Sequence, residues 1–416
     1  MGIESTTAME PKIAAVHGMA PELKDKFRAL SKEYLSDAVG KTIIKVATRP
    51  PPEENFYPHH TVGDDFAYKY EPVQWWTAGF FPGSIWQLYQ RSLHVPQALS
   101  SDDLLGLALK WQKGLEHHQY NKDTHDLGFM ILPSFYSHYK NCNNLTSRDI
   151  VINAAKSLSS RWSETVQSLR SWDECVTKRF NFTNKDTDFL VIADNMMNLD
   201  LLYLGSELTG DPEYARRATI HAKTTLLHQL RPDYSTYHLV NFDPDTGAVK
   251  GRYTVQGYED ESCWARGQAW ALYGYATAYR FTRDAQFLEA STKLSEYFCR
   301  RVNEVTDPEQ LGAVFWDFDS PRPPAVLDTS ASMIACSGLL LLYQLTGLPD
   351  FLPTVIKMME HTARKSRLPE SADTIIGGAT VNNNKDSKNP VAETGLVYAD
   401  YYFLEVGNRL IDLGLV

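Results

Sequence analysis

The sequence has few cysteines and no long run of basic residues. Its five cysteines are Cys142, Cys175, Cys263, Cys299 and Cys336, an odd and scattered set without a CxxC pair. This spacing argues against a disulfide scaffold or a cysteine zinc site and predicts reduced thiols in the core. The net charge is −10, and no cluster of Lys and Arg is long enough to follow a phosphate backbone. We therefore expect no nucleic-acid partner, although a small anionic ligand would need only one or two local cations.

Signals for targeting and several common catalytic motifs are also missing. The opening residues, MGIESTTAMEPK, have neither the charged start nor the apolar run of a secretory signal, and no apolar stretch reaches bilayer-spanning length. We expect a cytoplasmic protein with no membrane partner. The sequons at Asn144 and Asn181 would matter only in the secretory pathway. The GxSxG, P-loop and HExxH motifs do not occur, which argues against the chemistries that depend on them.

Aromatic residues are plentiful. The chain has 416 residues, of which 43% are hydrophobic, 22% charged and 12% aromatic, with nine Trp and 22 Tyr. This is an ordinary globular composition with enough apolar material for a large core. Such aromatic content is typical of proteins that bind the flat faces of sugars, although most of these rings would simply fill the core.

One helical pattern recurs along the chain. A helix ending in aromatic and Leu residues leads to a Thr/Asp turn and a second helix rich in Ala and Lys, as in LLYLGSELTGDPEYARRATIHAK. The turn aspartates are Asp149, Asp211, Asp284 and Asp350. A period of roughly 65 residues gives about six helical hairpins, and the absence of distinct cap repeats favours ring closure. We predict an all-α fold, a single alpha/alpha barrel of inner and outer helices over residues 21–416 after a flexible tail at 1–20. Its first helix would cover residues 21–46.

The segment DTHDLGFM, residues 123–130, sets His125 and Asp126 against apolar side chains. Asp126 could cap a turn through its side chain, or it could belong to a polar site set into an apolar wall. His125 is a poor candidate for a metal ligand, because no second His or Cys lies at ligand spacing.

Asp194 lies in a second acidic segment, DFLVIADNMMNLDLLYLGSELTG, residues 188–210. If one helix covers the segment, Asp194 lies on an apolar face, where burial favours the protonated form that a general acid needs near neutral pH. If FLVIA is extended, Asp194 is instead the N-cap of a helix starting at Asn195, and amide contacts would hold it ionised. The sequence leaves both interpretations open.

Two aromatic segments suggest a sugar site. In WWTAGFFPGSIW, glycine and proline interrupt an aromatic run before a helix, which could leave Trp75 or Trp76 projecting into a cavity, unless the rings only plug the barrel. In CWARGQAW, Arg266 and Trp270 are four residues apart and share a helix face, where they could bind a sugar carrying a carboxylate. The alternative is an arginine bound to a structural aspartate under a core tryptophan.

Four motifs in order, WWTAGFFPG, HDLGFM, IADNMMNLDLL and CWARGQAWALYG, resemble the unsaturated glucuronyl hydrolase family, and the resemblance extends to the C-terminal YADYYFLE. It implies a six-hairpin alpha/alpha barrel and a hydrolase that removes a 4,5-unsaturated uronic acid from the non-reducing end of lyase-generated oligosaccharides. It implies a catalytic pair, Asp126 and Asp194. It also implies substrate-binding roles for Trp76, His125, His238, Gln256, Arg266 and Trp270. Phe81 departs from the family, whose members often have Trp there.

The implied chemistry requires no metal or organic cofactor, because side chains supply the acid and the base. We expect a small anionic oligosaccharide, an unsaturated disaccharide, as the partner, and a monomer or weak homo-oligomer. The segment NNNKDSK, residues 382–388, is predicted to contact the neighbouring sugar. Alternative functions are an unsaturated rhamnogalacturonyl hydrolase acting on pectin fragments, an inverting glycosidase on saturated sugars, and a catalytically inactive sugar-binding barrel.

Overall fold

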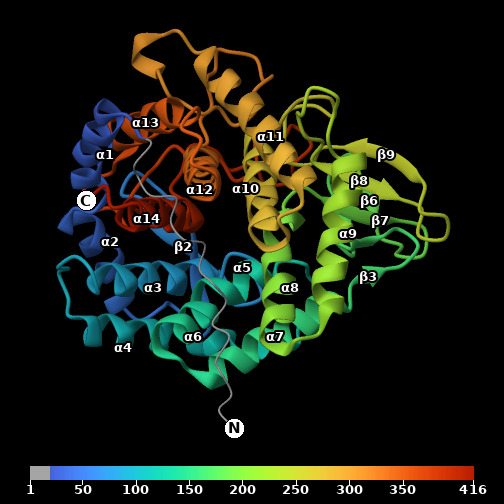
Figure 1. The fold of residues 1–416 in the computed structure, drawn as a ribbon, viewed down its shortest axis with the longest axis horizontal. Helices are drawn as coiled ribbons and strands as arrows, with labels where there is room; N and C mark the ends of the chain where they lie inside the picture. The colour runs from blue at the N-terminus through green and yellow to red at the C-terminus, as the bar shows by residue number, and fades with distance from the viewer. Residues whose placement is uncertain (1–18) are drawn as a thin grey trace.

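Within residues 19–416, which the computed structural model describes, six helical segments form a closed inner ring (Figure 1). They are α3 (Phe80–Ser92), α5 (Leu127–Ile131) with the π-helix η3 (Leu132–Tyr136), α8 (Asn195–Thr209), α10 (Ala265–Thr282), α12 (Thr329–Thr346) and α14 (Val397–Asp412). Each packs on the next, and α14 packs on α3. The predicted all-α barrel is therefore confirmed. The predicted flexible tail lies outside the described residues, except for its last two positions.

A second layer of helices surrounds this ring. It consists of α1 (Pro21–Tyr34), α2 (Asp37–Thr48), α4 (Ser101–Gln112) with the 3-10 helix η2 (Lys113–Tyr120), α6 (Ser137–Cys142), α7 (Leu145–Ser159), α9 (Pro212–His228), α11 (Ala285–Asn303) and α13 (Leu352–His361) with η5 (Thr362–Ser366). Helices α7, α9, α11 and α13 pack on α5, α8, α10 and α12 respectively. A short 3-10 turn, η4 (Pro308–Gln310), follows α11.

The hairpin turns match the predicted aspartates in part. Asp211 and Asp284 are the N-caps of α9 and α11, where their side chains accept backbone N–H bonds of 2.9 Å. Asp149 was wrongly predicted as a turn residue, because it lies inside α7, whose N-cap is Asn144. Asp350 lies in the turn just before Phe351, the N-cap of α13. The periodicity therefore located the hairpins, whereas the capping residue varies between them.

The predicted first helix is wrong in one respect, since residues 21–46 belong to two helices. The chain is extended at Ser36, with ψ at 148°, and α2 begins at the following Asp37. A serine followed by an aspartate is a typical helix start, and it interrupts the amphipathic pattern without a proline or glycine.

The two chain ends complete the barrel together. The Tyr34 ring of α1 stacks on Phe403 of α14 with centroids 4.1 Å apart. Arg91 of α3, fully buried, donates to Asn408 Oδ1 at 2.9 Å, to the Tyr34 carbonyl at 3.2 Å and to the Leu404 carbonyl at 3.1 Å. A buried guanidinium is stable only when its donors are used in this way, so Arg91 ties α1, α3 and α14 at the closure point.

Four small antiparallel sheets occupy loops of the barrel; the sequence left open a strand at FLVIA, and none of the others was predicted. They are β1 (Phe56–Val62) with β2 (Ala67–Pro72), β3 (Trp162–Ser163) with β4 (Ser168–Leu169), β5 (Cys175–Val176) with β6 (Asn181–Phe182), and the sheet β7 (Phe189–Ile192), β8 (Leu239–Phe242) and β9 (Val249–Tyr253). The three-stranded sheet lies beside α9 in Figure 1. Ile192 pairs with Leu239, and the Ala193 N–H donates to the His238 carbonyl at 3.0 Å, which fixes His238 beside Asp194.

Helix α12 is long and apolar enough to cross a bilayer by length and composition, contrary to the expectation from the sequence. In the structure 83% of that window is buried inside the protein. This environment is typical of a core helix, and α12 lies in the inner ring.

Candidate active site

The predicted site residues converge where the inner helices begin. Trp76 precedes α3, Asp126 and Asp194 hold the N-cap positions of α5 and α8, Arg266 lies in the first turn of α10, and Tyr398 lies in the first turn of α14. The Trp76 ring lies 5.2 Å from the Tyr398 ring, and the Arg266 guanidinium lies 5.5 Å from it. Residues more than 300 positions apart in sequence therefore share one end of the barrel.

Asp194 combines features of both interpretations of its segment. Its backbone follows the second, because β7 is extended and Asp194 is the N-cap of α8. Its side chain makes no capping hydrogen bond, it is 6% exposed, and Oδ1 has no partner among the described residues. Burial raises the pKa of Asp194 to about 7, with a further rise from Asp126, while the Arg266 charge lowers it. The carboxyl thus has the electrostatics expected of a general acid.

Asp126 occupies the N-cap position of α5 without capping it. Its Oδ2 accepts a hydrogen bond of 2.8 Å from Thr124 Oγ1, and its Oδ1 lies 3.3 Å from His125 Nε2. His125 is fully buried, and burial lowers its pKa, so the ring next to Asp126 is neutral at neutral pH. The structure places both residues at the site, with Asp126 close enough to Asp194 to raise its pKa.

His238 is a neutral hydrogen-bond donor. Its Nδ1 accepts the Val255 N–H at 3.2 Å, so the proton of the neutral ring lies on Nε2. That Nε2 is buried and has no partner among the described residues. Burial lowers the pKa of His238 to about 3, with a smaller contribution from Arg266. This unpartnered N–H is available to a ligand.

Arg266 is held mainly by the protein. It pairs with the fully buried Asp328 at 2.6 Å and donates to the carbonyls of Thr380 at 2.5 Å and Val381 at 2.6 Å. Its Nη2 also donates to Gln256 Oε1 at 3.2 Å. The structural aspartate considered as the alternative from the sequence is therefore present, and it is Asp328.

Aromatic rings form the walls of the site. Trp270 is fully buried, 5.0 Å from the Phe129 ring, and its indole N–H lies near enough to Asp194 to lower the pKa of that carboxyl. Trp76 is half-buried and presents more surface to a ligand. Phe81 faces the outer layer instead, 4.6 Å from the Trp111 ring.

Two further aromatic residues at the site were not singled out from the sequence. Tyr398, from the YADYYFLE motif, is buried with a hydroxyl that has no partner among the described residues, and Asp194 and Arg266 both affect its pKa. Trp264 lies 4.6 Å from the Arg266 guanidinium and 4.6 Å from the His238 ring. Both lie in segments that carry the family resemblance, CWARGQAW and YADYYFLE, and this was the signal that could have found them.

The segment 382–388 was predicted to contact the neighbouring sugar, and two of its side chains contact the protein. Asn382 Nδ2 donates to the Val255 carbonyl at 2.9 Å, and Asn384 Nδ2 donates to the Gly257 carbonyl at 2.6 Å. These bonds hold the two residues that flank Gln256.

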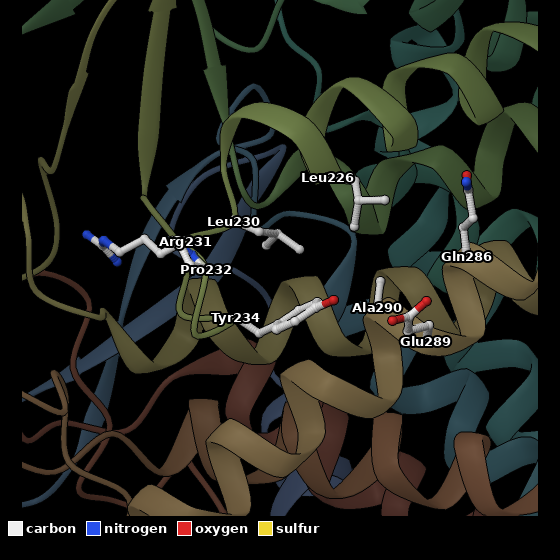
Figure 2. A pocket seen from close by; sticks show the side chains of 8 residues that line it. All are labelled: Leu226, Leu230, Arg231, Pro232, Tyr234, Gln286, Glu289 and Ala290. Atoms are coloured by element: carbon white, nitrogen blue, oxygen red, sulfur yellow. The ribbon is translucent and has the colours of Figure 1, made fainter.

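A cavity of about 390 Å³ lies away from this site (Figure 2). Figure 2 shows Leu226, Leu230 and Tyr234 on one side and Glu289 and Ala290 of α11 on the other. None of the predicted site residues lines it. The candidate active site is therefore defined by converging side chains and by their unpartnered polar atoms.

Known proteins show similarity over nearly the whole chain, although no protein-family model matches it. An unsaturated glucuronyl hydrolase of Formosa agariphila is 35% identical over 396 residues, covering 94% of this chain and 92% of its own. A crystal structure of an unsaturated glucuronyl hydrolase specific for heparin has a TM-score of 0.78 and 29% identity, covering 94% of this chain and 98% of its own. A UGL variant with the oligosaccharide dGlcA-Glc-Rha-Glc has a TM-score of 0.78 and 26% identity, covering 91% and 96%.

These similarities agree with the motifs and with the barrel. The implied enzyme class is therefore confirmed as a hydrolase that removes unsaturated uronic acid from oligosaccharides. The chain belongs to the unsaturated glucuronyl hydrolase family.

Proposed function

We propose that Asp194 and Asp126 carry the reaction on a small anionic oligosaccharide, an unsaturated disaccharide. The observation that carries this proposal is the Asp194 carboxyl, which is buried, has an unpartnered oxygen and has a pKa raised to about 7. A group with this pKa keeps a proton at neutral pH and can still release it to a substrate. The family gives the reaction, and the geometry supports this assignment of the acid.

The substrate double bond between C4 and C5 is a vinyl ether, because C5 carries the ring oxygen. Asp194 donates its proton to C4, which leaves a cation shared by C5 and the ring oxygen. Water then adds at C5 and gives a proton back to the ionised Asp194. The hemiketal opens, the oxygen on C1 becomes a hydroxyl, and the neighbouring sugar leaves as C1 becomes an aldehyde. Because C1 is never attacked directly, the rule that links carboxylate separation to stereochemistry does not apply.

Asp126 sets the proton affinity of its partner. Its nearby charge raises the pKa of Asp194, and a hydrogen bond from the Thr124 hydroxyl holds its carboxylate in place. When two carboxyl groups share one site, their pKa values move apart, so that one keeps its proton and acts as the acid while the other is ionised.

Neutral donors and rings orient the sugar. His238 offers Nε2–H, Gln256 offers its amide nitrogen, and Trp270 offers its indole N–H, while Trp76 supplies an apolar face. We expect Arg266 to attract the substrate carboxylate by its charge and to act through Gln256, because its Nη groups already bind Asp328, two carbonyls and Gln256.

The test is turnover of lyase-generated disaccharides that differ in the linkage, identity and sulfation of the neighbouring sugar. Loss of the ultraviolet absorbance of the conjugated alkene reports the reaction directly. We expect turnover of at least one glucuronyl disaccharide. Turnover of rhamnogalacturonan products alone would shift the substrate to pectin fragments. Hydrolysis of saturated glycosides without loss of the alkene signal would contradict the proposal.

A further inference from the structure

Three consecutive carbonyl groups next to the site each accept a hydrogen bond from a side chain. Asn382 Nδ2 donates to the Val255 carbonyl at 2.9 Å, and Trp316 Nε1 donates to the Gln256 carbonyl at 2.8 Å. Asn384 Nδ2 donates to the Gly257 carbonyl at 2.6 Å. Backbone in a loop more often bonds to neighbouring backbone or to water, so a row of three side-chain donors is unusual. The three donors come from two separate loops that both pack on residues 255–257.

The backbone N–H groups of the same segment are also fixed. The Val255 N–H donates to His238 Nδ1 at 3.2 Å, and the Gly257 N–H donates to Thr254 Oγ1 at 2.8 Å. A Cβ atom on Gly257 would lie 2.8 Å from Thr254 Oγ1 and 2.9 Å from Asp317 Oδ2, so one of these side chains would have to shift to admit it. The segment therefore has little room to move.

This fixed backbone determines how the Gln256 side chain meets the site. Its Oε1 accepts from Arg266 Nη2 at 3.2 Å, so the amide nitrogen points away from Arg266. Arg266 also donates to the carbonyls of Thr380 and Val381, immediately before Asn382. Residues 380–384 thus hold both the Gln256 backbone and the arginine that orients its side chain.

We infer that Asn384, assisted by Asn382 and Trp316, is a positioning residue that acts on substrate through Gln256. This inference rests on the proposed function, in which the Gln256 amide binds the sugar. Asn384 is 5% exposed, and its Oδ1 accepts the Asp386 N–H at 2.8 Å. Both the nitrogen and the oxygen of the Asn384 amide therefore bind protein groups, so its effect on substrate is indirect.

Loss of one fixed bond would let Gln256 move by a fraction of an ångström. Reacting groups tolerate little displacement, and a shift of about 1 Å can reduce the rate on the order of 100-fold. We expect Asn384→Ala to lower kcat/KM by about 10- to 100-fold. Because Asn384→Ala acts by displacing Gln256, the fold decrease in kcat/KM should be the same for disaccharides with different neighbouring sugars.

The experiment compares Asn384→Ala with Gln256→Ala, with the double variant, and with Asn153→Ala as a control. Asn153 also donates one side-chain hydrogen bond, to Gln119 Oε1 at 2.8 Å, but it lies on the outer helix α7. In the Gln256→Ala background, Asn384→Ala should cause no further loss. Hydrogen–deuterium exchange of residues 254–258 should be faster in Asn384→Ala and unchanged in Asn153→Ala.

Several results would overturn the inference. A factor that differs between disaccharides would place Asn384 on the neighbouring sugar, and an undiminished loss in the Gln256→Ala background would show that it acts without Gln256. Unchanged exchange of residues 254–258 would show that Asn384 does not hold the segment. If the wild-type protein turned over none of the disaccharides, the proposed function would fail, whereas the exchange data would still decide whether Asn384 fixes this backbone.

Discussion

Two buried aspartates, Asp194 and Asp400, have the same raised pKa and opposite surroundings. Burial raises the pKa of each to about 7, and each lies at the start of an inner helix. Asp400 accepts the N–H groups of Ile375 at 2.9 Å and Ile376 at 3.2 Å, and the hydroxyls of Thr374 and Tyr68 at 3.0 Å. Asp194 leaves Oδ1 without a partner among the described residues.

The difference shows that a raised pKa alone does not identify a catalytic acid. At Asp400 the carboxyl organises protein, since it holds the turn 374–376 and β2 against α14. At Asp194 the buried Oδ1 atom has no hydrogen-bond partner among the described residues, so it remains available to a substrate. The unpartnered oxygen therefore carries more information about function than the shifted pKa does.

The largest expected effect separates the two residues by activity. Asp194→Asn removes the transferable proton and should lower kcat by about 10²- to 10⁴-fold with the fold intact. Asp400→Asn should retain kcat within about tenfold, because its carboxyl oxygens bind protein donors and take no part in the proposed proton transfer. Alkene absorbance measures turnover, and circular dichroism checks the fold. Near wild-type turnover by Asp194→Asn would remove Asp194 from the role of acid.

When stability is measured, the larger effect should come from replacing Asp400 rather than Asp194. Asp400→Ala leaves two N–H groups and two hydroxyls without their acceptor in the core, which should cost about 3–5 kcal/mol of unfolding free energy. Asp194→Ala deprives the protein of no such set of hydrogen bonds and also removes a buried carboxyl that is costly to ionise, so it should not lower the unfolding free energy at pH 7. Urea unfolding measures both. Equal losses for the two variants would contradict the structural role assigned to Asp400.

The pH dependence of stability gives a finer contrast. The pKa of Asp194 rises from 3.8 to about 7 on folding, so the folded state binds its proton more tightly and the wild type loses stability as pH rises through this window. Asp194→Asn abolishes that loss and should be more stable than the wild type at pH 8 by about 2–4 kcal/mol. At pH 3.5 the difference should disappear. Urea unfolding at the two pH values tests this, and a constant difference would show that the Asp194 pKa is not raised.

The smallest effect concerns the charge of Asp126. Activity should fall above pH about 7 as Asp194 loses its proton. Asp126→Asn removes the neighbouring charge, so the alkaline limb of the residual activity should move to lower pH by about one unit. The pH profile of kcat/KM measures it. A limb that stays in place would show that Asp126 does not act on the proton of Asp194.

The barrel was predictable because its signal is distributed over the chain. Leu and aromatic stripes repeat in each hairpin, and Asp211 and Asp284 mark two turns. The strand β7 stayed undecided because a short apolar run such as FLVIA fits a buried strand and a helix equally well. Whether Asp194 lies within a helix or at its N-cap depended on that choice. Its backbone takes the N-cap position, whereas its raised pKa is the one expected if the carboxyl is buried on an apolar helix face.

The site was predictable as a set of residues and less so as a network of contacts. The family resemblance pointed to Asp126, Asp194, His238 and Gln256, and the structure brings these residues to one end of the barrel. The partner of Arg266 is Asp328, 62 positions away. Nothing in local spacing links those two residues, nor Asn384 to Gly257, because such contacts are decided by how the ring closes.

The common direction of the inner helices affects the local potential. Helices α8, α10, α12 and α14 all begin near the reacting carboxyl, so the positive ends of their backbone dipoles converge there. A protein with a net charge of −10 would repel an acidic sugar at a distance, yet this end of the barrel offers it a locally favourable field. Because salt screens long-range repulsion more than it weakens interactions within a buried site, a moderate rise in ionic strength should speed substrate capture rather than slow it.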